Sequence, residues 1–174
     1  LEDLGNGLYA WMQPDGSWGW SNAGFVRDGD ASLLIDTLFD EPLTAGMLAA
    51  LRDATGIAPD KIDYLVNTHA NGDHTHGNAL VANAEVIASD AAAQEMAELP
   101  PVALAKLKAA GAAGAMGEAG LYFAELFAPF DFTKARGRAP TRTFERRLDL
   151  KVGDKAVELH RLGPAHTAGD VLAW

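Results

Sequence analysis

The chain has 174 residues, of which 48% are hydrophobic, contains no cysteine and carries a formal net charge of -10. This length suits one domain with a substantial core and is short for two. The absence of cysteine excludes disulfides and thiolate metal sites, while the acidic charge argues against a nucleic-acid-binding surface, which needs a basic stripe.

The first forty residues are expected to be β-structure. Apolar stretches predict strands at 7–12, around 25–27 and at 31–37, with 18–20 as a further extended segment. Turn residues at 13–17 and 28–30 separate them. The last of these strands is apolar enough to be buried on both faces.

Between residues 41 and 98 the pattern alternates between helix and strand. Apolar residues spaced three or four apart predict a helix from Glu41 that stops at Thr55-Gly56. A strand at 62–66, a helix starting near Gly77 or Asn78, a strand at 85–88 and a helix capped by Ser89 or Asp90 follow. This alternation predicts an α/β layered domain with a central sheet.

Residues 100–142 are predicted to form a helical insertion or lid. The segment is rich in alanine, with glycines at 111, 114, 117 and 120, which fits either a flexible linker or a turn between two helices. Strands are expected again at 144–150 and 156–162, followed by a loop at 163–170. The chain starts at Leu1 rather than methionine and ends in the apolar run 171–174, so it resembles a piece of a larger domain.

The segment 68–78 follows a strand and contains three of the five histidines, His69, His74 and His76, together with Asp73. Imidazole and carboxylate bind Zn²⁺ or Fe²⁺ well when no thiol is available. A metal held this way lowers the pKa of its bound water to about 7, and a carboxylate such as Asp73 can orient that water or take its proton. The sequence therefore predicts a metal centre with Asp73 as the catalytic residue.

A plainer interpretation makes the same segment a polar helix N-terminus with surface histidines. Taken singly, His76 is expected to support the cluster from outside or to face solvent, and His160, which alternates with apolar residues, is expected to be structural. The basic run at 134–138 is expected to be a solvated loop, with a patch that steers an anionic substrate as the alternative.

The pattern His69-x-Asn71-x-Asp73-His74 resembles the H-x-H-x-D-H signature of the metallo-β-lactamase superfamily. The loop 163–170, with His166, resembles that family's second histidine block, and residues 22–37 resemble its N-terminal strands. The resemblance implies a four-layer αββα sandwich of which the N-terminal two-thirds is present.

The resemblance also implies one or two metal ions, usually zinc, with Fe²⁺ and Mn²⁺ as further options. Position by position, His69 and His166 would belong to a first metal site and Asp73 and His74 to a second, with Asp36 close behind them. Asn71 stands where the family normally has its second histidine. The family's remaining ligands lie beyond the end of this chain.

The main functional hypothesis is a metal-dependent hydrolase of the glyoxalase II-like branch that cleaves a small-molecule ester, thioester or lactone. One alternative is a mononuclear iron oxygenase of the persulfide-oxidising type. Another is a degenerate binding module without catalysis, which Asn71 favours. No membrane or nucleic-acid partner is expected, a cytoplasmic location is the default, and homo-oligomer formation stays open.

Overall fold

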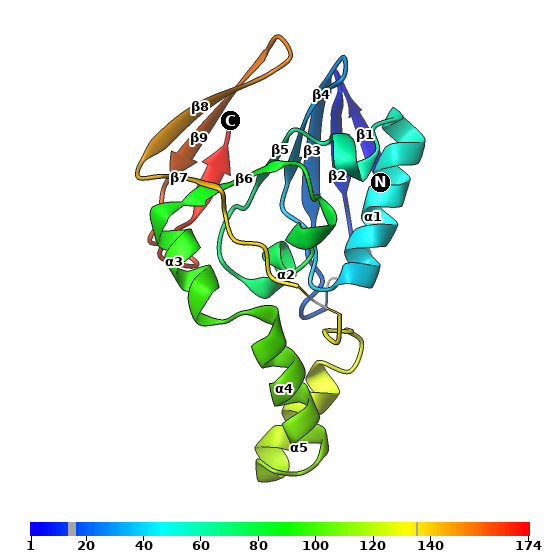
Figure 1. The fold of residues 1–174 in the computed structure, drawn as a ribbon, viewed down its shortest axis with the longest axis vertical. Helices are drawn as coiled ribbons and strands as arrows, with labels where there is room; N and C mark the ends of the chain where they lie inside the picture. The colour runs from blue at the N-terminus through cyan, green and yellow to red at the C-terminus, as the bar shows by residue number, and fades with distance from the viewer. Residues whose placement is uncertain (14–16, 135) are drawn as a thin grey trace.

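The computed structural model describes residues 1–13, 17–134 and 136–174 and contains two sheets (Figure 1). The larger sheet has seven strands in sequence order. These strands are β1 (Glu2–Gly5), β2 (Leu8–Trp11), β3 (Ala23–Asp28), β4 (Ala31–Ile35), β5 (Tyr64–Val66), β6 (Glu85–Ser89) and β7 (Arg142–Phe144). Strands β1 to β4 are antiparallel neighbours, and β4 to β7 pair in parallel. The smaller sheet has the order β10 (Val171–Ala173), β9 (Lys155–Arg161), β8 (Arg147–Val152).

The central strands of the larger sheet bury both of their faces, because successive side chains in a strand point to opposite sides. Leu34 and Leu65 belong to the core that includes residues of helix α1 (Glu41–Thr55). Their neighbours Leu33 and Val66 belong to the core shared with the smaller sheet. The molecule is therefore layered as helix, sheet and sheet (Figure 1), in agreement with the expected α/β sandwich class.

Helix α1 begins and ends, and helix α3 begins, where the sequence predicts. The Asp40 carboxylate accepts a hydrogen bond of 2.8 Å from the Leu43 backbone N–H, and Gly56 ends α1 with a φ of 77°. Helix α3 (Asp90–Glu98) starts at Ser89, whose hydroxyl accepts from the Ala92 N–H. Loss of one such cap costs about 1 kcal/mol.

Helices α4 (Pro101–Ala112) and α5 (Gly117–Leu126) form a hairpin that projects away from the two sheets (Figure 1). A Cβ atom on Gly111 would lie 2.3 Å from the carbonyl oxygen of Gly120, so the two backbones pack too closely for a side chain there. Of the two options that the alanine-rich sequence left open, the structure contains the turn between two helices. The hairpin joins the body through a phenylalanine cluster that includes Phe39, Phe127 and Phe130.

Three local predictions differ from the structure, and one strand was not predicted. Strand β1 was not predicted, and the expected extended segment around Trp18 is a turn, because its indole packs edge-on against Phe39 and Phe127. The helix expected near Gly77 is the short 3₁₀ helix η2 (Asn78–Leu80), since Gly77 lies in contact with Thr44 of α1. The single strand expected at 144–150 is split into β7 and β8.

Further connections complete the description. A 3₁₀ helix, η1 (Pro59–Lys61), precedes β5, and the one-turn helix α2 (Gly72–Thr75) lies inside the histidine-rich segment. Of the turn expected at 13–17, residues 14–16 lie outside the described part of the chain. None of the helices in the described ranges is at once long and apolar enough to traverse a lipid bilayer.

Candidate metal centre

Two adjacent parallel strands deliver the first residues of the site. Asp36 follows β4, and Thr68 and His69 follow β5, so these side chains meet at the carboxyl edge of the sheet. Asp36 adopts a φ of 64°, in the left-handed region that aspartate tolerates better than most residues. Its carboxylate accepts hydrogen bonds from the Thr68 backbone N–H at 2.7 Å and from the Thr68 hydroxyl at 2.6 Å. The two strand ends are thereby fixed to each other.

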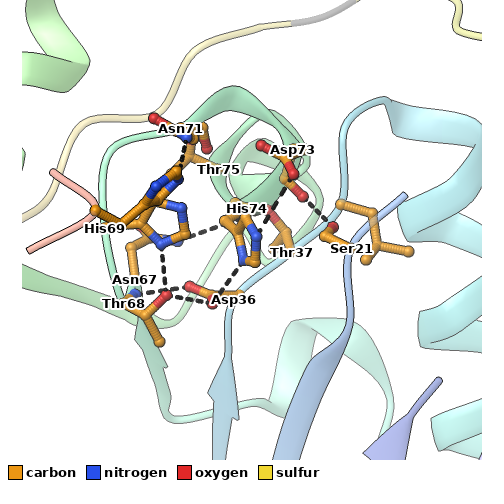
Figure 2. A network of polar contacts seen from close by, with 12 residues as sticks. Ser21, Asp36, Thr37, Asn67, Thr68, His69, Asn71, Asp73, His74 and Thr75 are labelled. Carbon is orange, nitrogen blue, oxygen red and sulfur yellow. Dashed lines mark hydrogen bonds and ion pairs between the residues drawn. The ribbon is translucent and has the colours of Figure 1, made fainter. Parts of the chain in front are cut away.

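Helix α2 brings Asp73 and His74 to the same edge (Figure 2). The His74 carbonyl accepts hydrogen bonds from the Thr37 backbone N–H at 3.0 Å and from the Asn67 side-chain amide at 3.0 Å. The buried Asn78 side chain completes this group, since its Oδ1 accepts from the Thr37 hydroxyl at 2.9 Å. These uncharged contacts hold the short helix in place although it has only one turn.

The imidazole of His74 is oriented by Asp36. Its Nδ1 lies 2.9 Å from Asp36 Oδ2, and its Nε2 lies 3.5 Å from Asp73 Oδ2 (Figure 2). A carboxylate that accepts from one ring nitrogen of a histidine fixes the tautomer and leaves the other nitrogen free to bind a metal. Asp36 therefore orients His74 so that Nε2 is available.

His69 occupies the centre of the histidine cluster and is buried, with 8% of its surface exposed. Its ring centroid lies 4.3 Å from that of His74 and 5.1 Å from that of His166. Its Nδ1 lies 2.9 Å from the Thr68 hydroxyl, so Nε2 is the nitrogen that this contact leaves free. Three imidazoles thus converge from β5, α2 and the loop 163–170.

The loop that carries His166 is braced by its own Asp170. That carboxylate accepts from the Ala165 N–H at 3.1 Å and from the Thr167 N–H at 2.9 Å. The Ser89 hydroxyl, at the start of α3, donates to the Gly169 carbonyl at 2.6 Å. The loop is therefore tied both to itself and to the larger sheet, which sets the position of His166.

Asn71 and His166 face each other on the exposed side of the site. Asn71 Nδ2 lies 2.8 Å from His166 Nε2, although the two residues are 95 positions apart in the chain. An amide N–H at that position donates to the lone pair that His166 would otherwise offer to a metal. The asparagine is thus within reach of the site, and binding of a metal by His166 Nε2 requires this contact to open.

Burial and charge shift the pKa values of the histidines in different directions. Burial lowers the pKa of His69, and neighbouring His74 adds to this. Burial also works against the charged form of His74, but the hydrogen bond and charge of Asp36, with the charge of Asp73, outweigh it and raise the pKa of His74. A neutral His69 is the form that binds a metal.

The donor set fits a divalent transition metal. One ligand atom each from Asp36, His69 and His74 lies within 4.8 Å of the others. The ring of His166 lies 5.1 Å from that of His69, and Asp73 Oδ2 lies 3.5 Å from His74 Nε2. Imidazole and carboxylate without thiolate suit zinc, iron and manganese. The Asp36 carboxylate already accepts from Thr68 and His74, which favours a supporting rather than a ligating role for it.

A cavity of about 630 Å³ adjoins this cluster. Asn71, Asp73 and His166 line it on the side of the site, and Trp18 and Phe127 line it on the side of the helical hairpin. The volume is sufficient for a small-molecule substrate. Asp73 and His166 therefore face a space that a substrate can enter.

The geometry brings together all of the residues predicted as ligands, which are His69, Asn71, Asp73, His74 and His166. Their metal-binding roles stay predictions. His76 is not solvent-facing: it is 4% exposed and packs against Phe39 and Phe132. His160 lies on β9 and pairs with Glu158 at 2.9 Å.

Sequence reasoning missed three supporting residues. Thr68 links Asp36 to His69, the Ser21 hydroxyl donates to the Asp73 backbone carbonyl, and Glu95 accepts from the Ala168 N–H at 3.3 Å. Only Thr68 had a signal, because it adjoins the motif at the end of β5. In the basic run, Arg138 donates to the Val81 and Ala84 carbonyls. Its guanidinium therefore holds the chain in place, which differs from the solvated loop expected at 134–138.

Solved structures with the same fold are metallo-β-lactamases and related proteins. A metallo-beta-lactamase from Pontibacter korlensis has a TM-score of 0.67 at 17% identity, covering 99% of this chain and 65% of that one. For the Rm3 metallo-beta-lactamase the TM-score is 0.60 at 18% identity, with coverage of 95% and 52%. The flavodiiron protein from Giardia intestinalis has a TM-score of 0.62 at 16% identity, with coverage of 99% and 37%.

No curated protein sequence matches the chain. The chain spans between about half and two thirds of the metallo-β-lactamases described above. The sequence model of the metallo-beta-lactamase superfamily matches residues 16–174, which include every predicted ligand. By this match and by its fold, the chain belongs to the metallo-β-lactamase superfamily.

Proposed function

We propose that the protein is a metal-dependent hydrolase that cleaves an ester, thioester or lactone of a small molecule, as in the glyoxalase II-like branch of the family. The observation that carries the proposal is the convergence of His69, His74 and His166 with Asp73 beside a cavity of about 630 Å³. Zinc is the proposed metal, as one or two ions, with Fe²⁺ or Mn²⁺ as the other choices.

The side chains of the chain would divide the work. The three histidines and Asp73 would hold the metal, and Asn71 would complete the set as a weaker oxygen ligand. When bound, such a metal lowers the pKa of water to about 7 and polarises a carbonyl group. Asp73, which is 27% exposed and lines the cavity, would orient the attacking water and take its proton.

A direct test compares hydrolysis rates of the zinc-loaded full-length protein on an aryl ester, a thioester and a lactone. The proposal predicts turnover of at least one class, abolished by a chelator and restored by added zinc. Asp73→Ala should remove it. Hydrolysis no faster than that of Asp73→Ala for all three classes would overturn the proposal.

Iron-dependent dioxygen chemistry is a second candidate. Asp36, His69 and His74 comprise two histidines and one carboxylate, a set that non-haem iron oxygenases use. The carboxylate is already engaged by Thr68 and His74, which makes this candidate weaker. Iron rather than zinc in the purified protein, with dioxygen consumption on addition of a persulfide, would favour it.

A non-catalytic binding module is the third candidate. It is favoured by the contact of 2.8 Å between the Asn71 amide and His166 Nε2, which uses a metal-binding nitrogen for a hydrogen bond. This candidate predicts that zinc does not displace the amide. A crystal structure or a histidine NMR spectrum after zinc addition separates it from the hydrolase.

A further inference from the structure

The cavity beside the histidine cluster has an aromatic surface at its mouth. The indole of Trp18 is 51% exposed, whereas the phenylalanine rings behind it, Phe39 and Phe127, are buried. Their ring centroids lie 5.6 Å and 4.7 Å from that of Trp18, both edge-on. The two phenylalanines therefore support the indole, about half of which stays exposed and can contact a ligand.

The charged residues that line the cavity are acidic. They are Asp73, Glu95 and Glu98, and the described lining includes neither lysine nor arginine. Glu95 Oε1 accepts from the Ala168 N–H, but its Oε2 is buried and has no hydrogen-bond partner among the described residues. Neither glutamate forms an ion pair within residues 1–13, 17–134 and 136–174.

The helix end at which these two glutamates lie adds to their negative charge. Both lie in the last turn of α3, which contains no basic residue. The carboxyl end of a helix carries a partial negative charge, so acidic side chains there are repelled and basic ones are normally preferred. The negative potential at the end of α3 thus arises from two carboxylates and from the helix itself, and the exposed indole of Trp18 lines the same cavity.

We propose that this cavity binds a substrate that carries an ammonium group attached to an apolar chain, with the apolar part against Trp18 and the positive charge near Glu98 and Glu95. An ammonium group is attracted both by carboxylates and by the face of an indole ring. The inference rests on the proposed function, since it takes the cavity as the substrate site. It makes cationic esters the preferred class over neutral ones of equal size.

Binding without turnover tests this directly. Isothermal titration calorimetry on the zinc-loaded full-length protein compares phenylpropyltrimethylammonium with 2-methyl-5-phenylpentan-2-ol, a neutral tertiary alcohol of similar shape. We expect the cation to bind about tenfold more tightly than the alcohol. The difference should shrink as salt is added, because exposed charges are screened.

Three variants locate the binding site. Glu98→Gln should lower the affinity for the cation about threefold and leave the affinity for the alcohol unchanged. Trp18→Ala should lower the affinity for both ligands about tenfold. Glu145→Gln is the matched control, since Glu145 is exposed, does not line the cavity and changes the net charge equally. It should leave both affinities unchanged.

Two results would overturn the proposal. One is equal affinity of the wild-type protein for the cation and the alcohol. The other is an equal effect of Glu98→Gln and Glu145→Gln, which would mean that only the overall charge attracts the cation. Because the probes are not hydrolysed, the outcome is independent of the hydrolase assay: an active esterase without charge preference disproves this inference alone, and cation binding without esterase activity disproves the hydrolase alone.

Discussion

The two halves of the candidate metal centre differ in how firmly the protein holds them. In the Asp36–His74 half, a buried carboxylate accepts from two groups of Thr68 and from His74, all at 2.9 Å or less. In the Asn71–His166 half, the residues are joined by one side-chain contact of 2.8 Å on the exposed side. One half is therefore preorganised by the fold, while the other can adjust when a metal binds.

The difference follows from chain topology. Asp36 and Thr68 end two hydrogen-bonded parallel strands, so their relative position is set by the sheet. Asn71 begins helix α2 and His166 lies in a loop 95 positions away, so no strand pairing sets their relative position. The loop of His166 is held by contacts such as those of Asp170 and Ser89. Regions that depend on few contacts open at lower free energy. Mutations in the two halves should therefore have different signatures.

Asp73→Ala is expected to have the largest effect, because Asp73 is both a proposed ligand and the proposed acceptor of the water proton. Turnover should fall by about a thousandfold or more, and metal content should decrease. Steady-state kinetics and elemental analysis measure both. Asp53→Ala, at an exposed position on α1, is the control and should leave both turnover and metal content unchanged. Full activity of Asp73→Ala would remove Asp73 from the site.

Asp36→Asn tests the buried half. The amide cannot supply both oxygens to Thr68 and His74, so metal affinity should fall 10- to 100-fold, as for other residues that orient ligands. The metal-free protein should lose about 3 kcal/mol, measured by urea unfolding. Asparagine tolerates the φ of 64°, so Asp36→Ala should be less stable still. Unchanged metal affinity in Asp36→Asn would show that Asp36 does not orient His74.

His76→Phe tests whether the burial of His76 makes the stability of the fold sensitive to acid. Burial lowers the pKa of His76 from 6.5 to about 4, so the unfolded chain takes up a proton that the folded one excludes. The neutral His76 therefore contributes to the free energy of unfolding fully above pH 6.5. This contribution, at most about 3 kcal/mol, is lost as the pH falls toward 4. Metal-free His76→Phe should lose less stability than wild type over that window. If the unfolding free energies of wild type and His76→Phe fell in parallel with pH, burial of His76 would not be the cause of the acid sensitivity.

Asn71→His is the smallest change and tests the adjustable half. An imidazole binds zinc better than a carboxamide, so metal affinity should increase about tenfold. The replacement also removes the amide that now contacts His166 Nε2. Metal titration with a competing chelator measures the effect. If the affinity does not change, residue 71 does not face the metal.

Most of the Asp36–His74 half of the site, and of the helices around it, could be predicted from the sequence. The helix signals at Gly56 and Ser89 are local, and both are observed. The motif residues lie within one segment, so their proximity follows from a single strand and a short helix. His76 could not be placed, because its burial depends on Phe132, which lies more than fifty residues away in the chain.

The Asn71–His166 half and the cavity could not be predicted from the sequence, because both depend on tertiary packing. The contact between Asn71 and His166 has no local signal and was suggested only by resemblance to a family. Glycines at 111 and 120 predict a turn or a linker equally well, and the close approach of their backbones decides between them. Glu95 and Glu98 resemble ordinary exposed helix residues until the fold places them beside the cavity.

Metal analysis of the full-length protein, purified without chelator, tests the central claim most directly. Elemental mass spectrometry should find close to one or two zinc ions per chain, and Asp36→Asn should contain less under the same conditions. Such a result would establish the histidine and aspartate cluster as a metal centre held from behind by Asp36. A wild-type protein that contains no metal, and takes up none when zinc is added, would contradict it.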